Sequence, residues 1–148
     1  MTIDVGNLLD QLDGLGKAER RAVTQLQAAL GSDLPAALRK RYHEAPTWRT
    51  RAACVFYSMA YARKSEDAVA LAREALHDKA KVVRYRAAML LAFSLRRDAL
   101  PELREVLREL RGKAGHEYVA AAIDAIEHQN HNFFVDRAHS GKRTMTIG

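Results

Sequence analysis

Apolar side chains recur every three to four residues along most of the chain, which is the period of an amphipathic α-helix. No stretch before residue 133 alternates like a strand, and no glycine occurs between Ser32 and Arg111. The pattern predicts an all-α chain with short polar turns. In the first half of the chain, helices are expected within residues 3–13 (before Gly14 and Gly16), at 17–30, after a cap at Ser32 or Asp33, and from Pro46. In the second half, helices are expected from about Ser65, over Val82 to Ala92, from a cap at Asp98 to Gly112, and from about His116 to His128.

The helix opened by Pro46 has one apolar stripe. Trp48, Ala52, Val55, Phe56 and Met59 follow the i, i+4, i+7, i+8 spacing of a single helix face. We therefore expect this face to be buried, and the only tryptophan with it.

A short motif repeats along the chain. Arg51-Ala52-Ala53 lies 35 residues before Arg86-Ala87-Ala88, and Ala121-Ala122-Ile123 lies 34 residues after Ala87-Ala88-Met89. A period of this length, built from paired helices, is typical of stacked helical repeats. The pattern over residues 17–128 resembles a HEAT-like repeat. The resemblance implies a right-handed α-α superhelix (a solenoid) of about four helix pairs.

The C-terminal residues lose the helical period. We therefore expect a helical repeat domain over residues 1–129 and a non-helical tail over 130–148. Phe133 to Asp136, a turn through Ser140-Gly141, and Arg143 to Ile147 predict a short hairpin, with an extended tail as the alternative. Two adjacent phenylalanines favour a tail docked on the last repeat, and a disordered tail is the other reading.

Length and composition exclude several classes of protein. The chain has 148 residues, a length typical of one domain, and 28% of them are charged. No apolar run approaches the length that a bilayer needs, and the first residues do not resemble a secretory signal. The single cysteine, Cys54, lies in an apolar stretch and is expected to be a buried, unreactive thiol. We expect a cytoplasmic protein that does not bind membranes.

The excess positive charge is concentrated in one repeat. The formal net charge is +6, and residues 79–113 hold ten basic and four acidic side chains, which account for all of it. In the helix from Asp98, Arg104, Arg108 and Arg111 form one stripe. HEAT-like stacks line their concave groove with the second helix of each pair, so the resemblance implies a basic groove that also includes Arg39, Lys40 and Arg73. The alternative is a solvated face whose Glu and Arg rows pair within the helix.

The sequence contains only poor matches to motifs of catalysis and metal binding. His43-Glu44 and His116-Glu117 are similar to the His-Glu pairs of deoxyhypusine hydroxylase, but that di-iron family needs four pairs in equivalent positions. His128 and His131, with Asp136 and His139 nearby, are of the ligand types that zinc prefers, yet they span a predicted helix end without a supporting cysteine. HEAT-like DNA glycosylases use an aromatic cluster that this chain lacks. We expect no catalytic residue, metal or cofactor.

The leading hypothesis is a non-catalytic module that grips a protein partner in its groove. Small proteins of this kind include bacterial immunity proteins that neutralise a toxin, and the chain resembles them weakly. Nucleic-acid binding through the arginine-rich third repeat is the first alternative, and an enzyme with a site at the histidine-rich tail is the second. The expected partner-binding residues are Arg39, Lys40, Arg73, Arg104, Arg108, Arg111, Asp136, Arg137 and His139.

Overall fold

The structure is a computed structural model that describes residues 3–13 and 16–146. Every regular element in these residues is helical, so the prediction of an all-α chain is confirmed. Gly14, expected to follow the first helix, lies outside the described residues. The elements are α1 (Val5–Asp10), α2 (Lys17–Leu30), η1 (Gly31–Asp33), α3 (Leu34–Glu44), α4 (Trp48–Ser58), η2 (Met59–Tyr61), α5 (Glu66–Ala75), α6 (Lys81–Ser94), η3 (Arg97–Ala99), α7 (Leu100–Glu109), α8 (His116–Glu127) and η4 (His131–Phe134), where η marks a 3-10 turn.

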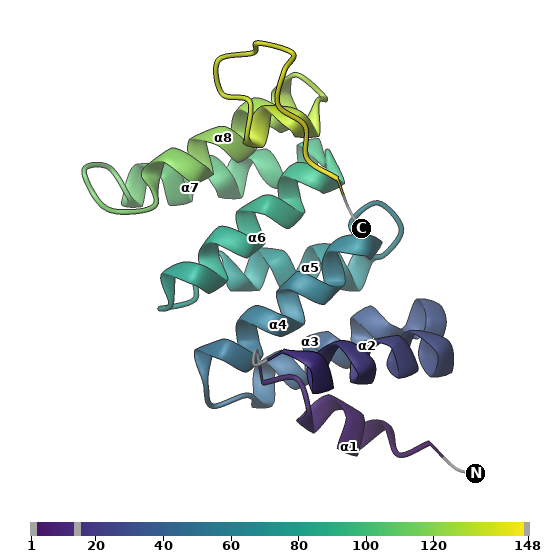
Figure 1. Ribbon diagram of the computed structural model, residues 1–148. Coiled ribbons are helices and arrows are strands. Elements are labelled where there is room, and N and C mark those ends of the chain that lie inside the picture. The colour runs from purple at the N-terminus through teal and green to yellow at the C-terminus, as the bar shows by residue number, and fades with distance from the viewer. Residues whose placement is uncertain (1–2, 14–15, 147–148) are drawn as a thin grey trace.

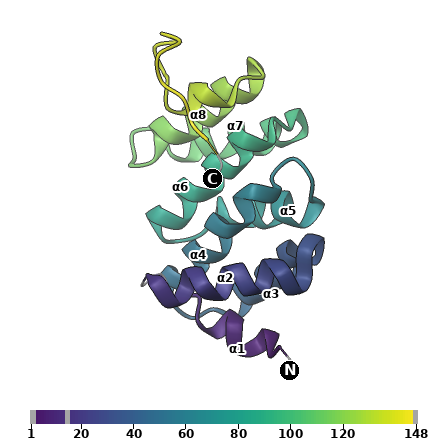
Figure 2. The ribbon, with the colours of Figure 1, turned by 45° about the vertical axis from the view of Figure 1, so that its right-hand side comes forward.

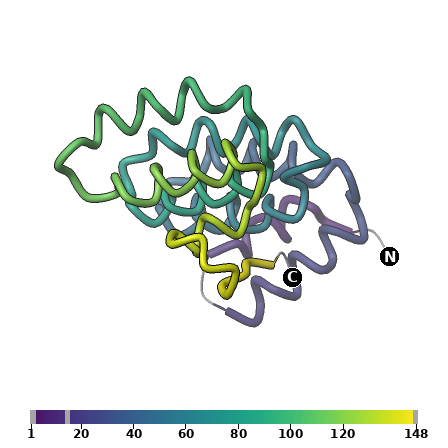
Figure 3. The backbone as a smooth tube through the Cα atoms, turned by 90° about the horizontal axis from the view of Figure 1, so that it is seen from above, coloured from purple at the N-terminus to yellow at the C-terminus, as the bar shows by residue number. Residues whose placement is uncertain are grey.

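The helices lie in two layers (Figure 1). In the front layer α4 packs against α6 and α6 against α8, while α3, α5 and α7 lie behind them. Within each consecutive pair across the layers, α3 packs on α4, α5 on α6, and α7 on α8. The stack runs from α1 at one end to α8 and the C-terminal segment at the other (Figure 2). Viewed along the stack, α2 and the C-terminal segment lie on the same side, opposite α7 (Figure 3).

The repeated alanine pairs are buried in the front-layer helices. Each pair lies on a helix of this layer, and every member is almost completely buried. Small side chains allow helix axes to approach closely, so the repeat in the sequence corresponds to a repeat in packing. The pairs are Ala52-Ala53 on α4, Ala87-Ala88 on α6 and Ala121-Ala122 on α8.

Several helix ends follow from capping residues. Thr47 and Ser65 accept hydrogen bonds from Thr50 N (3.5 Å) and Ala68 N (3.2 Å), which start α4 and α5. Gly31 ends α2 with a φ of 50°. The predicted cap at Asp98 is wrong, because Asp98 lies inside η3 and its carboxylate accepts from Arg96 instead.

The C-terminal segment contains no strand in residues 130–146, so the predicted hairpin is wrong, and the segment instead folds back through the turn η4 and a turn at Asp136 to Gly141. Asn side chains take the backbone groups that a ladder would use: Asn130 accepts from Asn132 N (3.0 Å), and Asn132 accepts from Met145 N (2.9 Å). The first predicted arm begins instead as the turn η4. The second was expected to reach Ile147, which lies outside the described residues.

The paired phenylalanines dock as expected. Phe134 is 1% exposed and belongs to the main core, while Phe133 and Val135 pack against it from the edge. The turn η4 contacts both α8 and α6, and the Phe134 ring lies 5.5 Å from that of Tyr85 on α6. Burying a side chain of this size stabilises the fold by about 1.5–3 kcal/mol.

The described helices include none that combines the length and apolar character needed to cross a bilayer.

Candidate functional site

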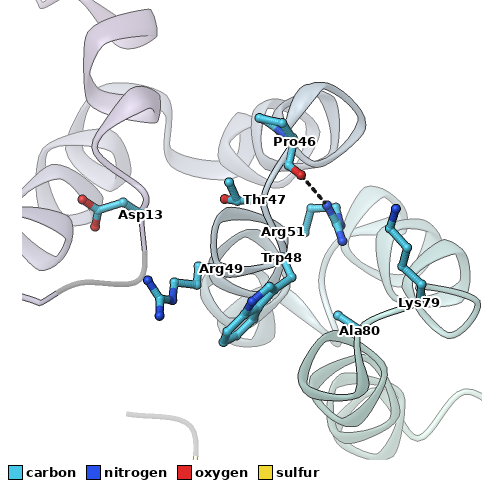
Figure 4. Close-up of a pocket in the computed structure, with 8 residues that line it drawn as sticks. All are labelled: Asp13, Pro46, Thr47, Trp48, Arg49, Arg51, Lys79 and Ala80. Carbon is cyan, nitrogen blue, oxygen red and sulfur yellow. Dashed lines mark hydrogen bonds between the residues drawn. The ribbon is translucent and has the colours of Figure 1, made fainter.

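A pocket of about 740 Å³ opens at the start of α4 (Figure 4). Trp48 lies at its centre and is 44% exposed. The guanidinium of Arg49 lies 5.5 Å from the indole centroid, in reach of a cation–π contact. Lys79 lines the opposite side, on the turn before α6. The pocket therefore presents one large aromatic surface between two cations, with the carboxylate of Asp13 on the Arg49 side.

Arg51, which also lines this pocket, has a structural role. Its guanidinium donates to both carboxylate oxygens of Asp78 (2.8 and 3.3 Å) and to the carbonyl oxygen of Pro46 (3.3 Å). Tyr42 Oη donates to the same carboxylate at 2.7 Å. Burial acts to raise the pKa of Asp78, but hydrogen bonds from Arg51, Ala80 N–H and Tyr42 outweigh it and leave the pKa below its usual value. The charge of Arg51 is therefore neutralised inside the fold.

A second opening, of about 320 Å³, lies farther along the front layer. We call it the front groove. Its floor is made by α4 and α6, and its sides by α2 and the C-terminal segment. It is lined by Arg20, Val23, Thr24, Gln27, Phe56, Tyr57, Met59, Ala60, Met89, Phe93, Met145 and Thr146.

Phe56 is the large apolar side chain that the front groove leaves open, with 46% of its surface exposed. Arg86 of α6 lies over its ring at 5.0 Å, and burial lowers the pKa of Arg86 from its ordinary value. Tyr57 Oη donates to the buried Glu19 of α2 at 3.1 Å, which connects the floor of the groove to its side. The groove is thus apolar inside and bordered by arginine.

Exposure of Trp48 and Phe56 corrects the sequence prediction. The helical stripe correctly identified Ala52, Val55 and Met59 as buried, but the two aromatic members of the stripe face solvent. Periodicity defines a face of one helix and does not show how far the neighbouring helices extend over it. The only indication of this exposure in the sequence is that the apolar stripe contains two aromatic side chains larger than its other members.

The predicted basic residues of α3 and α5 are used in ion pairs between helices. Arg39 Nε donates to Glu74 Oε1 of α5 at 2.7 Å, and His43, one turn later on α3, binds the other oxygen of Glu74. Burial acts to raise the pKa of Glu74, but these hydrogen bonds outweigh it and lower the pKa. The pKa of Arg39 is raised, chiefly by its hydrogen bond to Glu74.

The same arrangement recurs 34 residues later in the chain. Arg73 Nε donates to Glu102 of α7 at 2.7 Å, and His77 lies 3.1 Å from the other oxygen of Glu102. Arg39 and Arg73 are 34 residues apart, as are His43 and His77. The back layer is therefore less basic than the sequence indicates, because its arginines bind acidic side chains of the next helix.

The remaining predicted arginines and Lys40 are exposed on the back layer. Arg104 lies 3.8 Å from Glu127 of α8, an ion pair between helices rather than within one. Arg108 and Arg111 are exposed near the end of α7 and beyond it. The structure does not bring these residues together with the tail residues Asp136, Arg137 and His139, since the tail lies on the opposite side (Figure 3).

Asp136 holds the tail turn and is almost fully buried. It accepts hydrogen bonds from Ser140 N, Ser140 Oγ and Gly141 N at 2.8–3.0 Å. The Ser140 amide, followed by the other donors, keeps the pKa of Asp136 below its usual value. We therefore assign Asp136 a role in folding the turn, while Arg137 and His139 are exposed.

The histidine-rich segment separates into two groups. His131 accepts from Arg63 at 2.8 Å through Nδ1 and donates to Met145 O at 2.9 Å through Nε2, so it fixes the returning chain. His128 and His139 instead meet at Asp124 of α8, which the sequence prediction did not include. Cys54 is fully buried, and burial raises the pKa of its thiol to about 12, as expected of an unreactive cysteine.

Comparison of the chain with protein-family models, with curated protein sequences and with solved structures gives no match.

Proposed function

We propose that this chain is a HEAT-like α-solenoid and acts as a non-catalytic binding module that holds a protein partner in the front groove. The groove replaces the back-layer surface that the sequence suggested as the binding face, because Arg39 and Arg73 there bind Glu74 and Glu102.

Two repeats support the solenoid part of the proposal. The buried alanine pairs recur on α4, α6 and α8 with a period of 34–35 residues. The Arg-x-x-x-His clamps on α3 and α5, each closing on a glutamate of the next back-layer helix, recur with a spacing of 34. Equivalent contacts between successive units are the property that defines a repeat protein.

The observation that carries the binding proposal is that Phe56, a large apolar side chain, is exposed in a groove lined by other apolar side chains. An isolated exposed apolar side chain is ordinary, but Phe56 adjoins Met59, Met89 and Phe93 in one concave surface. Aromatic residues, methionine and arginine are enriched at protein–protein interfaces, and methionine adapts its shape to a partner. The groove therefore suits one large apolar side chain from the partner.

Charge around the groove favours an acidic partner. Arg20 lines it, Arg86 covers Phe56, and Arg49 and Lys79 border the adjacent Trp48 pocket. Cations at the rim steer an oppositely charged surface into contact and select against basic ones. The narrower hypothesis that the partner is a toxin stays a prediction.

A photo-crosslinking amino acid placed at one position at a time tests the proposal in the native host. Placement at Ala60, an exposed residue that lines the front groove beside Phe56, should give one dominant protein adduct. Placement at the exposed back-layer positions Lys40 and Arg108 provides the matched control. Equal or stronger adducts from the control positions would reject the groove as the binding face.

Nucleic-acid binding is a second candidate function, favoured by Trp48 and Arg49. An exposed aromatic ring beside cations is the arrangement on which single-stranded nucleic acids stack. Submicromolar binding of single-stranded oligonucleotides at physiological salt, lost in Trp48→Ala, would support it over the protein partner. Weak binding that disappears by about 150 mM salt would reject it.

A further inference from the structure

The C-terminal segment brings a third set of side chains together on α8, apart from the front groove. Asp124 lies in the last turn of α8 and His128, four residues later, caps its C-terminus, so both point to the same side of the helix. His139 reaches them from the tail. His139 Nε2 lies 2.6 Å from Asp124 Oδ2, and His128 Nδ1 lies 3.0 Å from Asp124 Oδ1. The potential ligand atoms of all three residues lie within 4.8 Å of one another.

The tail holds His139 in this position by several contacts. Its ring stacks on Phe133, with centroids 3.7 Å apart and planes 9° from parallel. Its backbone N–H donates to Asp136 O at 3.1 Å, inside the turn that the buried Asp136 carboxylate closes. The φ of His139 is 55°, a left-handed conformation that costs energy for a residue with a side chain. The imidazole is therefore directed at Asp124 before any ligand arrives.

We propose that Asp124, His128 and His139 bind a zinc ion, with three protein ligands and one position open to water. Two imidazole nitrogens and a carboxylate oxygen are ligand types that Zn²⁺ accepts in tetrahedral sites. Zinc–ligand bonds of about 2.0–2.2 Å separate neighbouring ligand atoms by about 3.3 Å, so the observed arrangement needs only small side-chain movements.

Zinc binding would change which ring nitrogen of His128 and of His139 carries the proton. In the metal-free arrangement each ring donates an N–H to Asp124. To coordinate zinc, His128 Nδ1 and His139 Nε2 would each give up that proton, which passes through solvent to the other nitrogen of the same neutral ring. His128 then gives up its 2.9 Å hydrogen bond to Asp124 O. Asp124 exchanges two hydrogen bonds for one metal bond.

The ion would connect α8 to the C-terminal segment, whose last described residues line the front groove. Met145 and Thr146 belong to that lining, and they follow His139 after a short turn. Zinc would therefore restrict the position of one side of the groove. This inference does not depend on the proposed function, because the ligands lie outside the groove.

Zinc binding by the tag-free full chain is the direct test, measured by titration calorimetry and by metal analysis after dialysis against ZnCl₂. We expect one zinc per chain, and at least a tenfold loss of affinity in each of Asp124→Asn, His128→Gln and His139→Gln. His116→Gln, which changes a histidine outside the cluster, should bind as the unmodified chain does. At about 100 times the dissociation constant, zinc should raise the melting temperature of the unmodified chain by about 5–10 °C and not that of His139→Gln.

Two outcomes would overturn the inference. One is substoichiometric zinc that dialysis removes from the unmodified chain, which means adventitious binding only. The other is unchanged affinity in the His128→Gln, His139→Gln double variant, provided that its circular dichroism matches that of the unmodified chain. Co²⁺ in place of Zn²⁺ gives a further readout, since a four-coordinate site predicts strong visible absorption bands, and weak bands would contradict that geometry.

Discussion

Asp78 shows how one side chain connects three helices. Its carboxylate is 5% exposed and binds Arg51, which is 12% exposed, together with the hydroxyl of Tyr42. It also accepts from Ala80 N at 2.9 Å, and its carbonyl accepts from Arg84. Asp78, on the turn before α6, therefore joins α3, α4 and α6, whereas the sequence predicted only the helix over Val82 to Ala92.

Asp78→Ala should lower the free energy of unfolding by about 3–5 kcal/mol, because removing one partner leaves the nearly buried Arg51 without its counter-charge. Urea denaturation followed by circular dichroism measures the change. Glu105→Ala, at an exposed position on α7, is the control and should stay within about 0.5 kcal/mol. A loss below about 1 kcal/mol for Asp78→Ala would contradict this role.

At the scale of elements, the sequence predicts where a helix begins and ends better than it predicts which segments pack around that helix. The boundaries of α2 and α8 agree with prediction to within a residue, because Gly31 and the apolar period define them locally. The front groove could not be predicted, since the exposure of Phe56 depends on where α2 and the tail pass over α4. The third metal-ligand candidate, Asp124, was also missed, because a fold-back of the tail brings it to His139.

The start of α8 gives an element-scale prediction. Gly115 has a φ of 99°, and a Cβ built on it would lie 2.5 Å from the Tyr118 hydroxyl, which belongs to a buried side chain. Gly115→Ala should therefore lower the unfolding free energy by about 1–3 kcal/mol, measured by urea denaturation. Gly141→Ala, also at positive φ but with open space around it, should cost less. Equal losses of stability in the two variants would mean that the positive φ alone is responsible and that the clash with Tyr118 contributes nothing.

Docking of the tail gives a second element-scale prediction. Phe134→Ala should destabilise the chain by about 3–5 kcal/mol, because it opens a cavity in the core beside Tyr85. Phe56→Ala is the matched control and should change the unfolding free energy by less than about 1 kcal/mol, since its ring is half exposed. Thermal and urea melts measure both. Similar losses for the two variants would contradict the assignment of Phe134 to the core.

For the whole molecule, the two layers differ in the side chains they use. The back layer joins its helices by ion pairs, while the front layer buries its alanine pairs and leaves aromatic side chains exposed beside cations. The net charge of +6 is consequently a poor guide to which surface is basic, because the positions of the acidic side chains decide which arginines are not already paired within the fold.

The ion pairs between helices predict acid sensitivity. The pKa values of Glu74, Asp78 and Glu102 are lowered in the folded chain, so the unfolded chain binds more protons at low pH. Their contribution to stability should be complete above about pH 5 and should be lost as the pH falls below about 4. Melting temperatures from pH 3 to 8 measure this. Arg39→Gln combined with Arg73→Gln should flatten the profile, and a flat profile in the unmodified chain would contradict the prediction.

Affinity for the protein captured from the front groove tests the central claim most directly. Calorimetric titration should show that Phe56→Ala and Met89→Ala each weaken binding by about 2 kcal/mol or more, which is roughly a thirtyfold rise in dissociation constant. The triple change of Arg104, Arg108 and Arg111 to Ala on the back layer should alter it by less than about threefold. If the triple variant loses binding while Phe56→Ala and Met89→Ala keep it, the partner binds the back layer and the front groove is not the binding site.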